Sequence, residues 1–304
     1  MRFFNTAGPV NCQDHYCLPP LTRFDLSDIL TLISQKKYFI LHAPRQSGKT
    51  SCLLALRDYI NNTDEYRSLY INVEAAQAAR EDVENGMYAI IAEIMKRVEQ
   101  GNVIPNPSIL ADAVKGNPNA FSVLNILLSK LASSSDKHLI LLIDEIDSLV
   151  GDTLISVLRQ IRAGYDTRPL HFPSTVILCG VRDIRDYRIH SKKENGIITG
   201  GSAFNIKAES LRLGNFLEEE TRMLLLEHTR ETGQKFEEDA IALIWNLSEG
   251  QPWLVNALAY EVCFKIEMGK DLSHPITESL VMEAKERLIQ RRETHLDQLA
   301  DKLK

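Results

Sequence analysis

The chain has 304 residues, of which 44% are hydrophobic and 25% charged, with a formal net charge of -6 and a pI near 5.8. This is ordinary globular composition, and it excludes a strongly basic nucleic-acid footprint over the whole chain, though not a local basic patch. No apolar run approaches the roughly 20 residues that span a bilayer, and no secretory leader is evident. We therefore expect a cytoplasmic protein without a membrane segment. Five cysteines without a C-x-x-C pair indicate reduced thiols rather than a disulfide framework.

Hydrophobic periodicity predicts alternating helices and strands after an irregular arm at residues 1–25. In chain order, the predicted elements are a helix at 26–36, a strand at 38–42, a helix at 48–60, a strand at 68–73, helices at 80–100 and 121–133, a strand at 138–143, a helix at 152–163, and strands at 174–180 and 204–213. Residues 102–119 and 182–202 are expected to be loops. From residue 217 only helices are predicted, at 217–231, 237–249, 252–268 and 276–303.

This order of elements predicts an α/β fold. Alternating strands and helices favour a parallel sheet with helices on both faces, which gives a three-layer core. The change to an all-helical pattern predicts a second domain. We expect an N-terminal arm at 1–25, the α/β core at 26–214, and a helical domain at 215–304.

The stretch HAPRQSGKTS, from His42 to Ser51, lies between the first strand and the next helix. It ends like the phosphate-binding loop G-x-x-x-x-G-K-[ST], but Ala43 replaces the first glycine. Pro44 biases Ala43 towards extended backbone, so we expect Ala43 to make the turn at negative φ. A chance GKT at a helix start is the alternative. The predicted binding residues are Pro44, Arg45, Gln46, Ser47, Gly48, Lys49, Thr50 and Ser51.

Chemical roles follow from this loop and from a second stretch. Lys49 would bridge the β- and γ-phosphates, and the Thr50 hydroxyl would ligate Mg²⁺. Residues 139–143 form an apolar strand that ends in Asp144 and Glu145, the form of a Walker B element. Asp144 would hold Mg²⁺ through water, and Glu145 would act as general base on the attacking water. Acidic loops after strands are common, so the prediction of a nucleotide site rests on both stretches together.

Arg182 follows the strand at 174–180, which we expect to lie beside the Walker B strand. There it would reach the γ-phosphate as a sensor; a surface arginine is the alternative. Cys12, His15 and Cys17 lie close together, but with no evident fourth ligand they are weak evidence for zinc.

The chain resembles the AAA+-related ATPases of the STAND group, and more narrowly bacterial AAA-like ATP-binding proteins with PRQSGKT loops. The resemblance rests on residues 44–50, 141–147, 180–182 and 250–252. It implies a P-loop NTPase core with a helical lid, ATP and Mg²⁺ as cofactors, and Arg182 as the sensor arginine. It also implies that Pro252 lies near adenine and that residues 16–20 help to form the adenine pocket.

The same resemblance raises the question of an arginine finger. Arg159 and Arg162 lie on the helix after the Walker B element, where AAA+ rings place such a residue. A solvated helix face is the alternative for both arginines.

The sequence thus predicts an ATP hydrolase that acts as a nucleotide-dependent molecular switch, with slow hydrolysis of ATP to ADP and phosphate. The site residues are Lys49, Glu145 and Arg182 for catalysis, Thr50 and Asp144 for Mg²⁺, and Pro252 for the base. One alternative is an oligomeric AAA+ ATPase acting on nucleic acid, which the acidic balance disfavours. Another is a non-hydrolysing nucleotide-binding adaptor. We expect an unidentified protein partner, and oligomerisation stays open.

Overall fold

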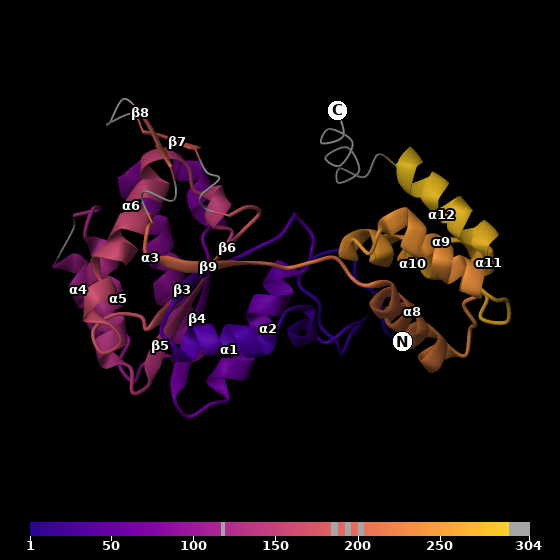
Figure 1. The fold of residues 1–304 in the computed structure, drawn as a ribbon, viewed down its shortest axis with the longest axis horizontal. Helices are drawn as coiled ribbons and strands as arrows, with labels where there is room; N and C mark the ends of the chain where they lie inside the picture. Colours follow the sequence, from indigo (N-terminus) through magenta and orange to yellow (C-terminus); the bar gives the residue numbers. More distant parts are fainter. Residues whose placement is uncertain (117–118, 184–187, 192–195, 200–203, 292–304) are drawn as a thin grey trace. The chain divides into compact units, whose positions relative to one another are not determined.

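The computed structural model describes residues 1–116, 119–183, 188–191, 196–199 and 204–291. The chain forms two compact units (Figure 1). Unit 1 contains Met1–Arg23, Gln46–Ser51 and the described residues from Gly214 onward, and unit 2 contains Phe24–Arg45 and Cys52–Leu213. Among the described helices, none combines the length and the apolar character that crossing a membrane requires.

A five-stranded parallel sheet forms the centre of unit 2, with strand order β4-β5-β6-β3-β9. The predicted α/β fold with a parallel sheet is therefore confirmed. The strands are β3 (Tyr38–His42), β4 (Tyr66–Asn72), β5 (His138–Asp144), β6 (Thr175–Gly180) and β9 (Lys207–Arg212).

Helices cover both faces of this sheet. One hydrophobic cluster joins alternate strand residues, such as Ile40, Leu141 and Leu178, to the helices α3, α5 and α6. The intervening strand residues are also buried but lie outside that cluster, as do the buried residues of α1 and α2. Two buried faces explain why the strands are almost continuously apolar. Among its described residues, unit 2 has the helices α1 (Leu26–Ser34), α2 (Lys49–Asn61, whose first three residues belong to unit 1), α3 (Val83–Gly101), α4 (Ser108–Lys115), α5 (Val123–Ser134) and α6 (Gly151–Ala163). It also has the short 3-10 turns η2 (Glu74–Ala79), η3 (Ile146–Ser148) and η4 (Tyr165–Thr167).

The start of α5 is capped by a side chain from another helix. The Oε1 atom of Gln160, on α6, accepts hydrogen bonds from the backbone N–H groups of Leu124 (2.9 Å) and Asn125 (3.2 Å). Its Nε2 atom donates to the Ala120 carbonyl at 2.9 Å and to Ser156 Oγ at 3.0 Å. A buried amide with this many partners fixes α5 against α6, because each lost partner would leave a buried polar group unsatisfied.

Replacing Gln160 with leucine is therefore expected to lower the free energy of unfolding by about 2–4 kcal/mol, as a helix cap and buried hydrogen bonds are lost together. Chemical denaturation measures this. The matched control is Gln100→Leu, at an exposed position of α3, where a change within about 0.5 kcal/mol is expected. Equal effects in the two variants would show that the capping contact contributes nothing.

Two predicted loops contain secondary structure. The loop at 102–119 holds α4, which begins directly after Pro107. The loop at 182–202 holds a hairpin of β7 (Arg188–Ser191) and β8 (Gly196–Thr199), while 184–187, 192–195 and 200–202 lie outside the described residues. Prolines in the first segment, and polar residues with glycines in the second, concealed these elements, because such residues can flank a short element as well as break it.

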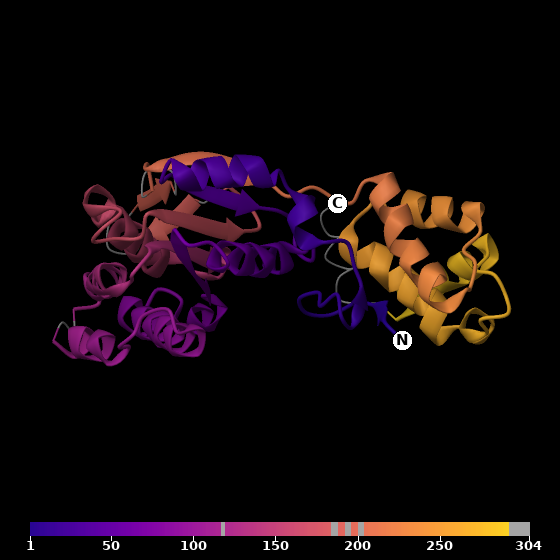
Figure 2. The same cartoon turned by 90° about the horizontal axis from the view of Figure 1, so that it is seen from below.

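Unit 1 combines the N-terminal arm with a bundle of helices, drawn in orange to yellow in Figure 2. The arm is less irregular than predicted, because β1 (Phe3–Phe4) and β2 (His15–Tyr16) pair in parallel and the 3-10 turn η1 (Pro20–Arg23) follows. Phe4 and Tyr16 are buried in the core of the bundle. The helices are α8 (Glu218–Thr232), α9 (Glu238–Ser248), α10 (Pro252–Lys265), α11 (Glu267–Lys270) and α12 (Glu278–Gln290).

The prediction of reduced cysteines is wrong for two of the five. Cys12 and Cys17 form a disulfide in the arm, with their Cα atoms 5.4 Å apart. The pairing removes two of the three residues weighed as zinc ligands, and the described part of the chain holds no group of three or more His, Cys, Asp or Glu side chains suited to a metal. Cys52, Cys179 and Cys263 are buried thiols.

Candidate functional site

The turn between β3 and α2 has the backbone that a phosphate-binding loop needs. Gln46 and Gly48 have positive φ values of 60° and 87°, whereas Ala43 is not among the positive-φ residues. The negative φ predicted for Ala43 is therefore confirmed. Ala43 is also fully buried, and its N–H donates to the Gly180 carbonyl at 3.2 Å. The turn thus leaves the strand without a glycine at position 43, and the left-handed residues come later in the loop.

Glycine is required at position 48 by the backbone conformation there, not by a lack of space for a side chain. A Cβ atom added there would approach Arg23 Nη1 only to 3.5 Å, an ordinary contact, so the positive φ is what selects glycine. The helix α2 begins at the next residue, Lys49, which is only 5% exposed. A helix N-terminus directs backbone N–H groups and positive potential towards its approach, which suits a phosphate.

Arg23, which no sequence pattern indicated, contacts this loop within unit 1. Its guanidinium donates to the Ser47 carbonyl at 3.4 Å and to the Gly214 carbonyl at 2.6 Å, and it lies 4.4 Å from the centre of the Phe216 ring. A positive charge therefore lies next to the loop and holds it to the segment that leads into the helices. No pattern near Arg23 indicated this role, because its partners are 24 to 193 residues away.

Asp144 ends β5 as a fully buried carboxylate. Its Oδ1 atom accepts the N–H of Glu145 at 2.9 Å, and its Oδ2 atom accepts the hydroxyl of Tyr70 at 3.0 Å. Burial first, and then the neighbouring Asp144 charge, raise the pKa of Tyr70, so the Tyr70 hydroxyl stays protonated and acts as the donor. No sequence pattern indicated Tyr70, since its place beside Asp144 depends on strand order.

Glu145 adopts a strained backbone directly after Asp144. Its φ and ψ of 56° and 40° are in the left-handed region, which a non-glycine residue enters at a cost of about 1–3 kcal/mol. The side chain is half-buried. Strain of this kind is often retained where a side chain must point in a particular direction, which supports a functional role for Glu145.

The end of β6 brings Arg182 near the Walker B segment along the same sheet edge. β6 pairs with β5, so the predicted neighbourhood of these two strands is confirmed. Asp147 Oδ1 accepts the N–H of Val181 at 3.0 Å and thereby fixes the backbone just before Arg182. The Arg182 side chain itself is exposed. Because all strands of the sheet are parallel, the ends of β3, β5 and β6 meet at one edge, where ligands bind in such folds.

The residues present fit a magnesium ion by the chemistry of their donors. Asp144 offers a carboxylate and Thr50 a hydroxyl, and oxygen ligands of this kind are those that Mg²⁺ prefers, together with phosphate oxygens and water. Thr50 is the second residue of α2, immediately after Lys49. Each of the two side chains thus has the donor chemistry that such an ion requires.

The Gly250-Gln251-Pro252 motif forms the start of α10 in unit 1. Pro252 is the buried first residue of that helix, and Gln251 Oε1 accepts the Leu254 N–H at 2.6 Å as the cap. The Gln251 side-chain amide also lies 3.5 Å from the Gln46 carbonyl of the loop. The motif thus has a complete structural role as a helix start, and it places a glutamine side chain next to the loop.

Other residues considered from the sequence lie elsewhere. Tyr16 is buried in the core of unit 1, where its hydroxyl contacts His228 Nδ1 at 3.1 Å, and burial raises the pKa of Tyr16 to about 12. The side chain of Tyr16 therefore serves the core of unit 1, and the adenine pocket expected from residues 16–20 stays a prediction. Arg159 and Arg162 are exposed on α6.

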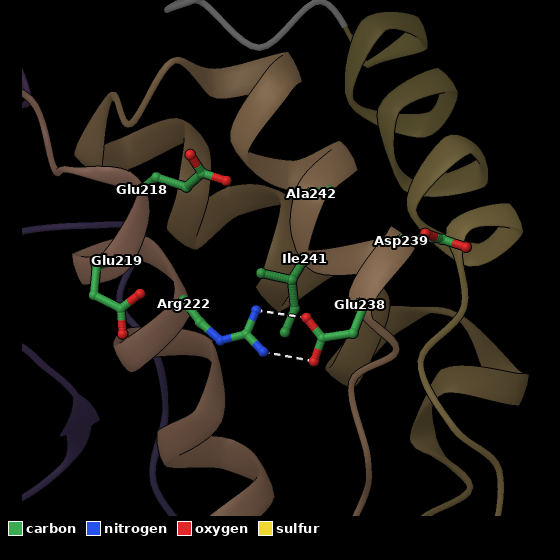
Figure 3. A pocket seen from close by; sticks show the side chains of 7 residues that line it. All are labelled: Glu218, Glu219, Arg222, Glu238, Asp239, Ile241 and Ala242. Carbon is green, nitrogen blue, oxygen red and sulfur yellow. Dashed lines mark hydrogen bonds and ion pairs between the residues drawn. The ribbon is translucent and has the colours of Figure 1, made fainter.

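A separate cavity lies between α8 and α9 of unit 1 (Figure 3). It is lined by Glu218, Glu219, Glu238 and Asp239 together with Arg222, Ile241 and Ala242. Arg222 donates two hydrogen bonds to the carboxylate of Glu238, at 2.6 and 2.5 Å. With four carboxylates and one paired cation, this cavity would repel a polyphosphate, so it is not a candidate for the nucleotide.

No known family model matches the chain, and no curated protein matches it in sequence. Solved structures match it in fold. A Walker-type ATPase of Pyrococcus abyssi superposes with a TM-score of 0.57 at 16% identity, over 98% of this chain and 80% of its own. Cdc6p from Pyrobaculum aerophilum superposes with a TM-score of 0.59 at 16% identity, over 89% of this chain and 68% of its own. Domain III of the replication initiation protein DnaA from Thermotoga maritima superposes with a TM-score of 0.52 at 14% identity, over 92% of this chain and 98% of its own. At these identities the similarity shows the fold alone, and it agrees with the predicted α/β core followed by helices.

Proposed function

We propose that this chain is an ATP-binding P-loop ATPase that acts as a nucleotide-dependent molecular switch. The observation that carries the proposal is the turn from β3 to α2, in which Gln46 and Gly48 have positive φ and a buried Lys49 opens the helix. The buried Asp144 and the strained Glu145 at the end of β5 support it. The fold similarity to a Walker-type ATPase agrees with it.

In the proposed reaction, water attacks the γ-phosphorus and the bond from that phosphorus to the β–γ bridging oxygen breaks. The products are ADP and inorganic phosphate. The backbone N–H groups of residues 46–50 and the Lys49 ammonium stabilise the phosphate charge, and Glu145 orients the water and accepts its proton. Bound Mg²⁺, held by Thr50 and Asp144, would neutralise charge on the phosphate oxygens.

The switch follows from contacts that depend on the γ-phosphate. Lys49 and Arg182 would touch that group in the ATP state and lose it in the ADP state. A ligand shifts a conformational equilibrium only through such differential contacts. Preference for adenine, with Pro252 near the base, rests on the sequence resemblance and the helix start at Gly250-Gln251-Pro252.

ATP binding and hydrolysis by the purified chain test the proposal directly. Replacing Lys49 with alanine is expected to reduce kcat/KM for ATP by at least about 100-fold, because the main cation at the phosphates is lost. Fluorescent-nucleotide titration and phosphate release measure it. The matched control, Lys130→Ala on the exposed face of α5, is expected to behave as wild type. Failure of the wild-type chain to bind ATP would contradict the assignment, and binding without hydrolysis would favour a nucleotide-dependent adaptor.

The fold similarity to domain III of a replication initiation protein favours, as a second candidate, an oligomeric ATPase that acts on nucleic acid. The net charge of -6 works against it. DNA-stimulated hydrolysis with a steep salt dependence would support this candidate. Slow hydrolysis that DNA leaves unchanged would support the switch.

A further inference from the structure

Packing alone does not explain the hydrogen bond between the Tyr70 hydroxyl and Asp144. Tyr70 is 4% exposed on β4, between the apolar residues Leu69 and Ile71. Phenylalanine would fill the same space, so the hydroxyl has to be explained by its partners. The Oδ2 atom of Asp144 accepts from it at 3.0 Å, and the side chain of Asn72 is a second hydrogen-bond partner.

Strand register places the two residues together. β4 and β5 are parallel neighbours, with Tyr70 opposite Leu142 and Asn72 opposite Asp144. Tyr70 therefore lies two residues before the level of Asp144 along the strand. Tyr70 and Asn72 lie on the same face of the sheet, because side chains alternate between the two faces. The hydroxyl reaches forward along the strand to the carboxylate. Arg97 of α3 covers the Tyr70 ring at 5.5 Å and limits its movement.

The two oxygens of Asp144 thus have donors from different directions. Oδ1 accepts the Glu145 N–H, and Oδ2 accepts the Tyr70 hydroxyl. A carboxylate can accept about four hydrogen bonds or metal contacts in all, and these two bonds are among them. Two fixed donors determine the plane of the carboxylate, as outer partners do for metal ligands in general.

We propose that Tyr70 is a positioning residue for the magnesium site, because its hydroxyl orients the Asp144 carboxylate towards the ion of Mg-ATP. This inference rests on the proposed ATP site. Tyr70 itself touches neither the ion nor the nucleotide in this account. Its effect should therefore appear as a loss of metal dependence rather than as a loss of nucleotide binding.

The test compares Tyr70→Phe with wild type in the full-length chain. ATP affinity is measured twice by titration, once with excess Mg²⁺ and once with EDTA, and the ratio of the two affinities is the readout. In Tyr70→Phe the ratio is expected to fall by about 10-fold, since outer-partner substitutions commonly cost metal affinity on that order. Affinity in EDTA is expected to stay unchanged. Tyr66→Phe, at the first residue of the same strand, is the control and should retain the wild-type ratio.

A double-mutant cycle with Asp144→Asn tests whether Tyr70 affects metal dependence through Asp144. If Tyr70 acts through Asp144, Tyr70→Phe should change the ratio no further in the Asp144→Asn background. An unchanged ratio in the single variant would overturn the inference while the ATP site stands. Equal losses of affinity with and without Mg²⁺, together with a lower melting temperature, would also overturn it, because Tyr70 would then only maintain the fold. If wild type binds no ATP, the proposed function itself fails, and the inference with it.

Discussion

Replacing Glu145 with glutamine is expected to lower kcat for ATP hydrolysis by about 10²–10⁴-fold, the usual contribution of a general base, while ATP affinity stays near that of wild type. Glutamine keeps the size of the side chain but cannot accept a proton from water. The left-handed backbone at this position is strained for both residues, so stability should change little. Steady-state phosphate release and equilibrium nucleotide binding measure the two quantities separately.

The matched control is Glu249→Gln. Glu249 is also a left-handed glutamate, with φ 47° and ψ 34°, but it is exposed at the end of α9. This variant experiences the same chemical change on a similar backbone and is expected to hydrolyse ATP as wild type does. Hydrolysis by Glu145→Gln at the wild-type rate would show that another group activates the water.

Replacing Gly250 with alanine is expected to destabilise the helical part of unit 1 by at least about 4 kcal/mol, which is exceptional for a single substitution. Gly250 has φ 71°, and a Cβ atom there would lie 2.0 Å from the Phe216 carbonyl oxygen and 2.7 Å from Trp245 Cζ3. The backbone cannot withdraw easily, since the Phe216 N–H donates to the Gly250 carbonyl at 2.8 Å. Thermal unfolding followed by circular dichroism measures the loss.

Gly233→Ala provides the matched control for this experiment. Gly233 has a similar φ of 80°, but nothing lies within 4 Å of an added Cβ atom. Alanine there is expected to cost only the conformational penalty of about 1–2 kcal/mol. The difference between the two variants isolates the steric term at Gly250. If both substitutions cost the same, the glycine of the Gly250-Gln251-Pro252 motif would need an explanation other than packing.

The glycine in that motif shows how a functional pattern and a structural requirement can coincide. Gly250 is explained by the close approach of Phe216, Gln251 by the helix cap, and Pro252 by its place at the first helical residue. None of these roles depends on a nucleotide. The structural roles therefore explain the three residues, and the proposed role of Pro252 near adenine needs a binding experiment of its own.

Local patterns in the sequence determined the order of elements in unit 2 and the two segments that carry the proposed chemistry. The strand before Ala43, the helix after Gly48, and the apolar strand before Asp144 are read from consecutive residues, because periodicity and glycine content act over a few positions. The short helix α4 and the hairpin were missed, since the prolines around α4 and the polar residues and glycines around the hairpin also suit a loop.

Only the tertiary structure decided which distant residues meet. The order β4-β5-β6-β3-β9 places Tyr70 beside Asp144 and Arg182 after the strand next to Walker B, and nothing local in the chain specifies that order. The same holds for the cap that Gln160 gives to α5, for Arg23 at the Ser47 carbonyl, and for the burial of Tyr16. Hydrogen bonds and packing between segments far apart in sequence arise from the folded chain as a whole. For that reason the sequence predicted the residues of the candidate site, and the fold supplied the neighbours that hold them.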